Sequence, residues 1–166
     1  MEAQASPMIP SNDKARGPDR RRGRTLQYAT FVLDRHVLGV PVLEVQEVLT
    51  AQEMTRVPLS SPVVSGLINL RGQIVMALDL RTRLGFPALP DGSASMNLVV
   101  QTAGGRVSLL VDKIGDVIEV PPDLFTPPPE TVDERLREVI DGVYKLKDCL
   151  LLALNTDAAT RIAVGA

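Results

Sequence analysis

The chain contains an internal repeat, which limits the folds that are open to it. Residues 66–80 read GLINLRGQIVMALDL, and residues 142–156, 76 positions later, read GVYKLKDCLLLALNT. Both stretches alternate aliphatic with other side chains, the period of two that is typical of β-strands. A second similarity, with an offset of 69 positions, aligns residues 45–48 (VQEV) with residues 114–117 (IGDV). The repeat predicts a mainly β fold made of two similar units.

Each unit is expected to hold about five short strands. Residues 28–40 and 95–112 read as hairpins, and Gly104 and Gly105 are expected to supply the positive φ of the second turn. Each hairpin is followed by another strand, a connection marked by proline and a final hairpin. A short five-stranded antiparallel sheet hides its edges by curling into a barrel. We therefore expect two barrels that share a core, joined by a surface linker near residues 86–95.

Helices are expected to be few and short. In the first unit, DLRTRLG predicts a helix capped by Asp79 and closed by Gly85. In the second unit, Asn155 is expected to cap a matching helix. Because Asp and Asn serve equally well as N-caps, the difference between the two copies needs no functional explanation. A further helical turn is expected in residues 130–140, with three apolar side chains on one side: Val132, Leu136 and Val139.

The composition indicates an aliphatic core and a reducing compartment. Among 166 residues there are three Phe, two Tyr and no Trp. The single cysteine, Cys149, cannot form an internal disulfide, and its apolar surroundings place it in the expected core. No apolar run approaches the roughly 20 residues of a membrane helix, and the N-terminus lacks the apolar stretch of a signal peptide. These features favour a cytoplasmic protein.

Charge separates the N-terminus from the rest of the chain. Residues 1–26 hold six basic and three acidic side chains, whereas residues 27–166 hold 12 basic and 17 acidic ones. We expect residues 1–26 to form a flexible basic tail and residues 162–166 a short C-terminal one. The run RRRGR could bind nucleic acid or anionic lipid, although a solvated tail is the more ordinary interpretation. The acidic body argues against a nucleic-acid partner.

A search for catalytic groups finds no convincing set. A nucleophile and a base would have to come from Cys149 and His36, which are expected in the core and in a solvated hairpin turn. Three acidic residues lack the spacing of a calcium loop and are read as a solvated strand face: Asp112, Asp116 and Glu119. GLINLRG continues into a strand and is no phosphate loop. We expect no enzyme activity, cofactor or metal; a small enzyme or ligand-binding barrel is the alternative from another class.

Function is then expected where the two copies differ. The first copy has Asn69, Arg71 and Gly72 where the second has Lys145, Lys147 and Asp148. The planar guanidinium of Arg71 suits two-point pairing with a carboxylate. Within the first copy of the repeat, Glu47 is the acidic residue expected to lie nearest to Arg71. We hypothesise that Glu47 and Arg71 pair, or lie together, on a surface used by a partner. The alternative is an ordinary surface salt bridge worth about 0–1 kcal/mol.

Four motifs, in order, resemble those of the CheW family of chemotaxis coupling proteins: VLEVQEVL, TRVPLSSPVVSGLINLRGQIVMALDLRTRLG, VSLLVDKIGDVIEVPPDLFTPPP and VIDGVYKLKDCLLLALN. The resemblance covers a domain of residues 27–161. It implies two intertwined five-stranded SH3-like β-barrels and a non-catalytic adaptor. Such an adaptor joins the cytoplasmic tips of methyl-accepting chemoreceptors to the regulatory domain of the histidine kinase CheA.

The resemblance also implies a location and a contact region. It implies a cytoplasmic protein at membrane-associated receptor arrays, without insertion into the membrane. Five residues match the family's partner-contact region: Val45, Glu47, Gly66, Asn69 and Arg71. An adaptor for another chemosensory pathway, controlling surface motility or development, fits the same residues and remains the alternative.

Overall fold

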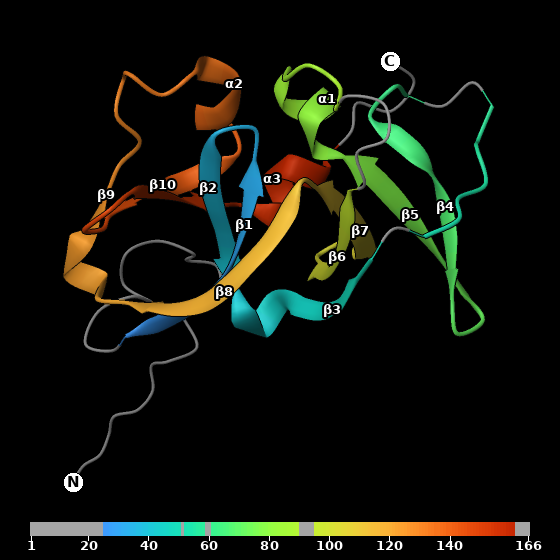
Figure 1. Cartoon of the computed structure of the whole chain (residues 1–166), viewed down its shortest axis with the longest axis horizontal. Helices are drawn as coiled ribbons and strands as arrows, with labels where there is room; N and C mark the ends of the chain where they lie inside the picture. The colour runs from blue at the N-terminus through green and yellow to red at the C-terminus, as the bar shows by residue number, and fades with distance from the viewer. Residues whose placement is uncertain (1–24, 51, 59–60, 90–94, 162–166) are drawn as a thin grey trace, which may run out of the picture.

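The computed structural model describes residues 25–50, 52–58, 61–89 and 95–161, and shows a mainly β chain with three short α-helices in those ranges. Figure 1 shows two lobes side by side, with α1, α2 and α3 between or above the sheets. The strands are β1 Leu26–Leu33, β2 His36–Pro41, β3 Val45–Leu49, β4 Val64–Leu70, β5 Gln73–Asp79, β6 Met96–Thr102, β7 Gly105–Val111, β8 Lys113–Val120, β9 Phe125–Thr126, β10 Ile140–Lys145 and β11 Leu150–Leu154.

Each sheet takes strands from both halves of the chain. The six-stranded sheet has the order β8-β1-β2-β11-β10-β9, and the five-stranded sheet has the order β3-β6-β7-β5-β4. The third strand of each unit thus pairs with the other unit: β8 with β1, and β3 with β6. The expected antiparallel pairing throughout each barrel was wrong, because β2 pairs with β11 and β5 with β7 in parallel. The prediction of two intertwined barrels is confirmed.

The two halves keep the same local irregularities. The β4–β5 register shifts between Val64 and Gly66, and the β10–β11 register shifts at the positions 76 residues later. Gly66 lies against the carbonyl oxygen of Thr55, which an added Cβ would approach to 2.7 Å. Gly142 lies in the same way against Thr126, at 2.5 Å. Both glycines are required because the segment paired alongside, at Thr55 or at Thr126, approaches more closely than a side chain allows.

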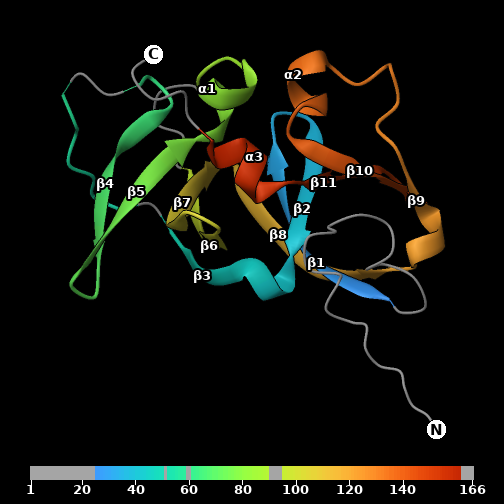
Figure 2. The same ribbon diagram turned by 180° about the vertical axis from the view of Figure 1, so that it is seen from behind.

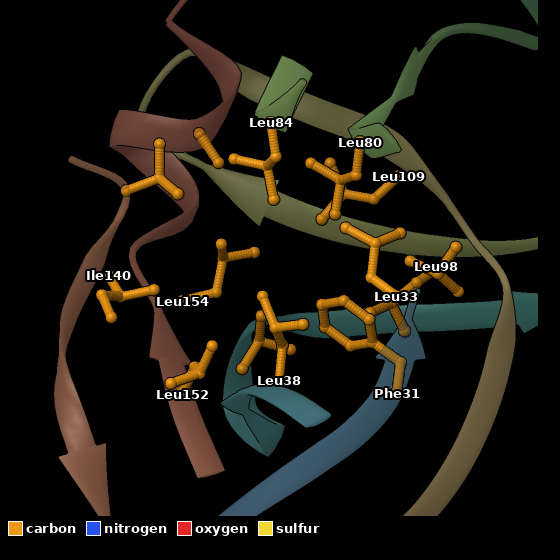
Figure 3. Close-up of a cluster of buried hydrophobic side chains, with 14 of the residues drawn as sticks. Phe31, Leu33, Leu38, Leu80, Leu84, Leu98, Leu109, Ile140, Leu152 and Leu154 are labelled. Atoms are coloured by element: carbon orange, nitrogen blue, oxygen red, sulfur yellow. The ribbon is translucent and has the colours of Figure 1, made fainter. Parts of the chain in front are cut away.

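The main core lies between the two sheets. Figure 3 shows its central side chains, with Phe31 and Leu38 from the six-stranded sheet facing Leu98 and Leu109 from the five-stranded one. Two smaller clusters, around Ile68 and around Tyr144, each draw their buried residues from one sheet alone. Because strands and core are both exchanged, neither half has a core of its own.

The short helices begin as their capping residues predict. The carboxylate of Asp79 accepts hydrogen bonds from the backbone N–H groups of Arg81 and Thr82 at the start of α1 (Leu80–Leu84), and Gly85 ends this helix at φ 82°. Asn155 caps α3 (Thr156–Thr160). The third helix, α2 (Glu134–Arg137), buries Leu136. Val139 just after it is buried too, and Val132 before it packs against the same core, so the three apolar side chains lie together as predicted.

Four sequence-based placements were wrong. Cys149 is exposed, because the backbone turn from Leu146 to Cys149 precedes β11 and keeps the thiol outside the core. His36 is half-buried, and its ring stacks on Phe86 with centroids 5.3 Å apart. Asp112 is paired rather than solvated, as described below. Positive φ is found at Gly105, not Gly104. Of the predicted flexible tails, 1–26 and 162–166, residues 1–24 and 162–166 lie outside the described residues, and Leu26 belongs to β1.

Candidate partner-binding surface

The turn between β4 and β5 is tight and has an unusual backbone. Leu70 and Gln73 are paired, so Arg71 and Gly72 alone form the turn, with φ of 50° and 86°. Two positive φ values define a type I′ turn, in which Asn or Gly is the usual first residue. Asn69 supports the turn because its side-chain oxygen accepts a hydrogen bond from the Gly72 N–H at 2.9 Å. We call residues 69–72 the NLRG turn.

Arg71 and Glu47 form an ion pair, as the sequence predicted. Glu47 lies on β3 and the NLRG turn follows β4, which are the first and last strands of the five-stranded sheet. The pair therefore joins the two edges of that sheet. Glu47 is 21% exposed and Arg71 is 78% exposed. An arginine so exposed to water contributes little to stability through such a pair, and its guanidinium remains accessible to a partner.

Two other predicted contact residues point inward. Val45 is half-buried and packs against the main core. Gly66 is buried beneath Thr55, with no side chain to offer. Both hold β3 and β4 in place, so the structure brings together at the surface only Glu47, Asn69 and Arg71.

Sequence reasoning missed an exposed aliphatic side chain beside the NLRG turn. Ile74 is 64% exposed and lies directly opposite Asn69 in the β4–β5 ladder. Its counterpart in the second copy, Leu150, packs against the main core. Val48, next to Glu47 on β3, is also exposed. The repeat aligns Ile74 with Leu150, so the sequence marks the two positions as equivalent. Only the structure shows that Ile74 is exposed whereas Leu150 packs against the core. An apolar side chain within a polar rim is typical of protein interfaces.

The second copy lacks this arrangement. The counterparts of Glu47 and Arg71 are Asp116 and Lys147, both exposed. Within the described ranges no ion pair joins Asp116 to a basic side chain. The two barrels share a fold but present different surfaces.

A second charged group, centred on Arg81, has a structural role. Arg81 donates from Nε and Nη2 to the two carboxylate oxygens of Asp112, at 2.8 and 2.7 Å. Hydrogen bonding to Arg81 lowers the pKa of Asp112, against the opposing effect of burial, and the same bond raises the pKa of Arg81. The backbone N–H of Asp34 also donates to Asp112. This group ties α1 to the β1–β2 and β7–β8 turns.

No catalytic or metal-binding arrangement emerges from the described part of the chain. An open cleft of about 200 Å³ runs beside Asp79, Arg81 and Asp112, whose polar groups are engaged by one another and by the capped helix. No three His, Cys, Asp or Glu side chains gather as metal ligands in the ranges described. None of the described helices is both long and apolar enough to cross a lipid bilayer.

Comparison with known proteins identifies the family. Residues 27–163 match the CheW-like domain. The chain belongs to the CheW-like family. A structural comparison agrees: the crystal structure of a scaffolding protein, TtCheW from Thermoanaerobacter tengcongensis, superposes with a TM-score of 0.75 and 25% identity, covering 84% of this chain and 94% of that one.

Relatives of this CheW-like chain come from several bacteria. The chemotaxis protein CheW of Bacillus subtilis is 28% identical over 128 residues, covering 77% of this chain and 82% of that protein. The CheW of Klebsiella aerogenes is 24% identical, covering 79% of each. Protein PilI of Pseudomonas aeruginosa is 30% identical over 104 residues, covering 63% of this chain and 58% of PilI. The relatives of this chain thus include proteins named CheW and a protein named PilI.

Proposed function

We propose that this chain is a non-catalytic adaptor of bacterial chemosensory signalling. In this role it couples methyl-accepting chemoreceptors to the regulatory domain of the histidine kinase CheA. The observation that carries the proposal is the surface formed by the NLRG turn, Glu47 and Ile74 on a CheW-like fold. This surface presents the guanidinium of Arg71 and the exposed side chain of Ile74, with no catalytic group among the described residues beside them. The combination is suited to binding a partner.

The mechanism is linkage between two binding events. An adaptor controls a kinase only if the assembled complex differs in free energy between signalling states. Two intertwined barrels with different surfaces suit this task, because a bridge needs two non-equivalent contacts. Val45 and Gly66 take part by holding the strands that carry Glu47 and Asn69. The site of action is the cytoplasmic side of receptor arrays, without insertion into the membrane and without nucleic acid or cofactor.

The second candidate is an adaptor for a chemosensory pathway other than flagellar chemotaxis. The similarity to PilI favours it, since that protein bears a different name from the CheW relatives. The two candidates differ only in which kinase and receptors bind. Binding to the regulatory domain of each CheA-type kinase of the same genome, measured side by side, separates them.

The decisive test is a calorimetric titration of the adaptor into a kinase regulatory domain, with three variants. Arg71→Glu removes the guanidinium and places two acids together. Glu47→Arg does the reverse, and the double variant Glu47→Arg/Arg71→Glu restores an ion pair with exchanged ends. Arg106→Gln is the matched control, because Arg106 is an exposed arginine on β7 of the same sheet.

We expect saturable binding by the parent chain and Arg106→Gln, and an affinity lower by about tenfold or more for Arg71→Glu, the loss of roughly one interface hot spot. The double variant should remain weak, because the partner needs Arg71 itself. Recovery of affinity in the double variant would show that the pair is only structural. Absence of binding to every kinase regulatory domain and every receptor tip of the genome would refute the adaptor function.

A further inference from the structure

One long strand has an open side. β8 is the outermost strand of the six-stranded sheet, and among the described strands it pairs only with β1. It runs across the front in Figure 1 and lies behind β1 and β2 in Figure 2. It is eight residues long, and its Val117 side chain is 53% exposed. Unpaired groups along a long edge strand recruit other chains, so proteins usually cover or protect such edges. In the described part of the chain no segment covers this side of β8.

Two of the three charged side chains on β8 are acidic; the basic one, Lys113, lies at the start of the strand, away from Val120. Asp116 and Glu119 are exposed on this strand, and the continuous segment 116–138 holds seven Asp or Glu against two Arg. Asp116 is the counterpart of Glu47, which has Arg71 as its partner in the first copy. Arginine has been replaced by Lys147 in the second copy, and among the described side chains none pairs with Asp116.

The chain's own basic segment begins beside this strand. Leu26 is paired with Val120 and Gln27 with Glu119, so the residues before Thr25 start at the end of β8. Residues 16–24 read RGPDRRRGR, with five arginines and one acid. From Val120 back to Asp116 is about 13 Å along the strand, and five extended residues span up to about 17 Å. The arginines are therefore within reach of both acids.

We propose that residues 16–24 dock along the open side of β8 and place their arginines against Asp116 and Glu119. Docking covers the exposed Val117 and gives Asp116 a cationic partner, which Lys147 does not provide among the described side chains. Its consequence is selectivity: β3, the counterpart of β8, stays open beside the NLRG turn, whereas the equivalent face of the other barrel is occupied. The molecule then offers one such face to partners instead of two. This inference does not depend on the identity of the partner.

Paramagnetic relaxation in the full-length chain tests the contact. A nitroxide is attached at Gly17→Cys in a Cys149→Ser background, since Cys149 is exposed and would also be labelled. The amide signals of Asp116 and Val117 should lose most of their intensity, while those of Glu47 and Val48 on β3 serve as the matched control. Replacing Arg20, Arg21 and Arg22 by Gln should restore the β8 signals. So should salt at about 0.5 M, where the Debye length is roughly 4 Å.

Two further samples separate the possible occupants. The first sample mixes isotope-labelled chain that carries no nitroxide with unlabelled chain that carries one. The β8 signals of the labelled chain should keep their intensity. A loss of intensity would mean that a second copy supplies the segment, and would overturn the intramolecular contact. The variant Asp116→Lys/Glu119→Lys should release residues 16–24 from β8. Replacing Arg20, Arg21 and Arg22 by Glu in that same variant should restore the contact. Equal broadening of β3 and β8, or broadening of β8 that ignores the arginine replacements, would also overturn the proposal.

Discussion

Arg81 and Asp112 form a two-point hydrogen-bonded ion pair that joins the two halves of the chain. The guanidinium belongs to α1 in the first half, and the carboxylate lies between β7 and β8 in the second. The side chains are 12% and 15% exposed, so the pair is far better shielded from water than Arg71 and Glu47. It should therefore matter for stability, whereas the more exposed pair should matter for binding.

Asp112→Asn should lower the free energy of unfolding by about 1.5–3 kcal/mol, the typical worth of hydrogen bonds to a charged group. The loss arises because Arg81 keeps its charge but loses its carboxylate. Urea unfolding followed by circular dichroism measures the change. Glu119→Gln, an exposed acid on β8, is the control and should change stability by less than about 0.5 kcal/mol.

The effect of Asp112 should also depend on pH. Because Arg81 lowers the pKa of Asp112 in the folded state, the unfolded chain binds the proton more readily. The stabilisation is complete above the unfolded pKa of about 3.9 and is lost as pH falls through the lower folded value. The stability difference between parent and Asp112→Asn should be constant near neutral pH and shrink below about pH 4. A difference that persists unchanged into strong acid would contradict this assignment.

Asn155→Asp should be harmful, although Asp is as good an N-cap as Asn. The Asn155 amide donates to the carboxylate of Asp141 at 2.9 Å, a contact that the capping argument alone does not include. An aspartate would face Asp141 with like charge, costing about 1.5 kcal/mol at neutral pH. The first copy has Asp79 with Ser65 at the matching positions. Adding Asp141→Ser should therefore recover much of the loss in thermal unfolding; no recovery would rule out this charge clash.

Gly142→Ala should destabilise the protein by about 1–3 kcal/mol through overpacking. The new Cβ would lie 2.4 Å from the ring of Phe125 and 2.5 Å from the Thr126 oxygen, where β9 pairs with β10. Gly104→Ala is the control, because its nearest neighbouring atom is 3.9 Å away. Equal free energies of unfolding for the two variants would mean that β9 moves aside without cost.

Arg71→Asn should leave stability unchanged or raise it. Asn suits the positive φ of the NLRG turn, whereas a residue such as Arg pays about 1–2 kcal/mol there. The exposed ion pair that is lost contributes only about 0–1 kcal/mol. Calorimetric unfolding measures the balance, and a clear loss of stability would show that the pair closes the sheet. Reduced partner affinity in the same stable variant would indicate that Arg71 is retained for binding.

Ile74→Ser should separate binding from folding. Ile74 is exposed, so unfolding should change by less than about 0.5 kcal/mol. Leu150→Ser, at the counterpart position against the core, should cost about 2 kcal/mol. Titration with the kinase regulatory domain and the receptor tip should show a loss of affinity of about tenfold for Ile74→Ser with one of them. Full affinity for both would exclude Ile74 from the interface.

Much of the fold follows from short-range patterns. Alternating aliphatic residues predicted the hairpins, and Asp79, Gly85 and Asn155 correctly marked the ends of the short helices. The pairing of Glu47 with Arg71 was also confirmed. Burial was less predictable: Cys149 lies in an apolar run, yet falls on a turn, and Asp112 looks solvated until α1 brings Arg81 to it.

The sequence alone determined a repeated β-rich chain, the positions of its hairpins and short helices and the residues by which the two copies differ, because periodicity and capping act over a few neighbouring residues. Only the tertiary structure decided that β3 and β8 exchange between the units, that Ile74 is exposed while Leu150 is packed, and that Arg81 meets Asp112. These choices depend on contacts between residues far apart in the chain. Two nearly equivalent repeats offer each strand two similar partners, and local sequence does not distinguish between them.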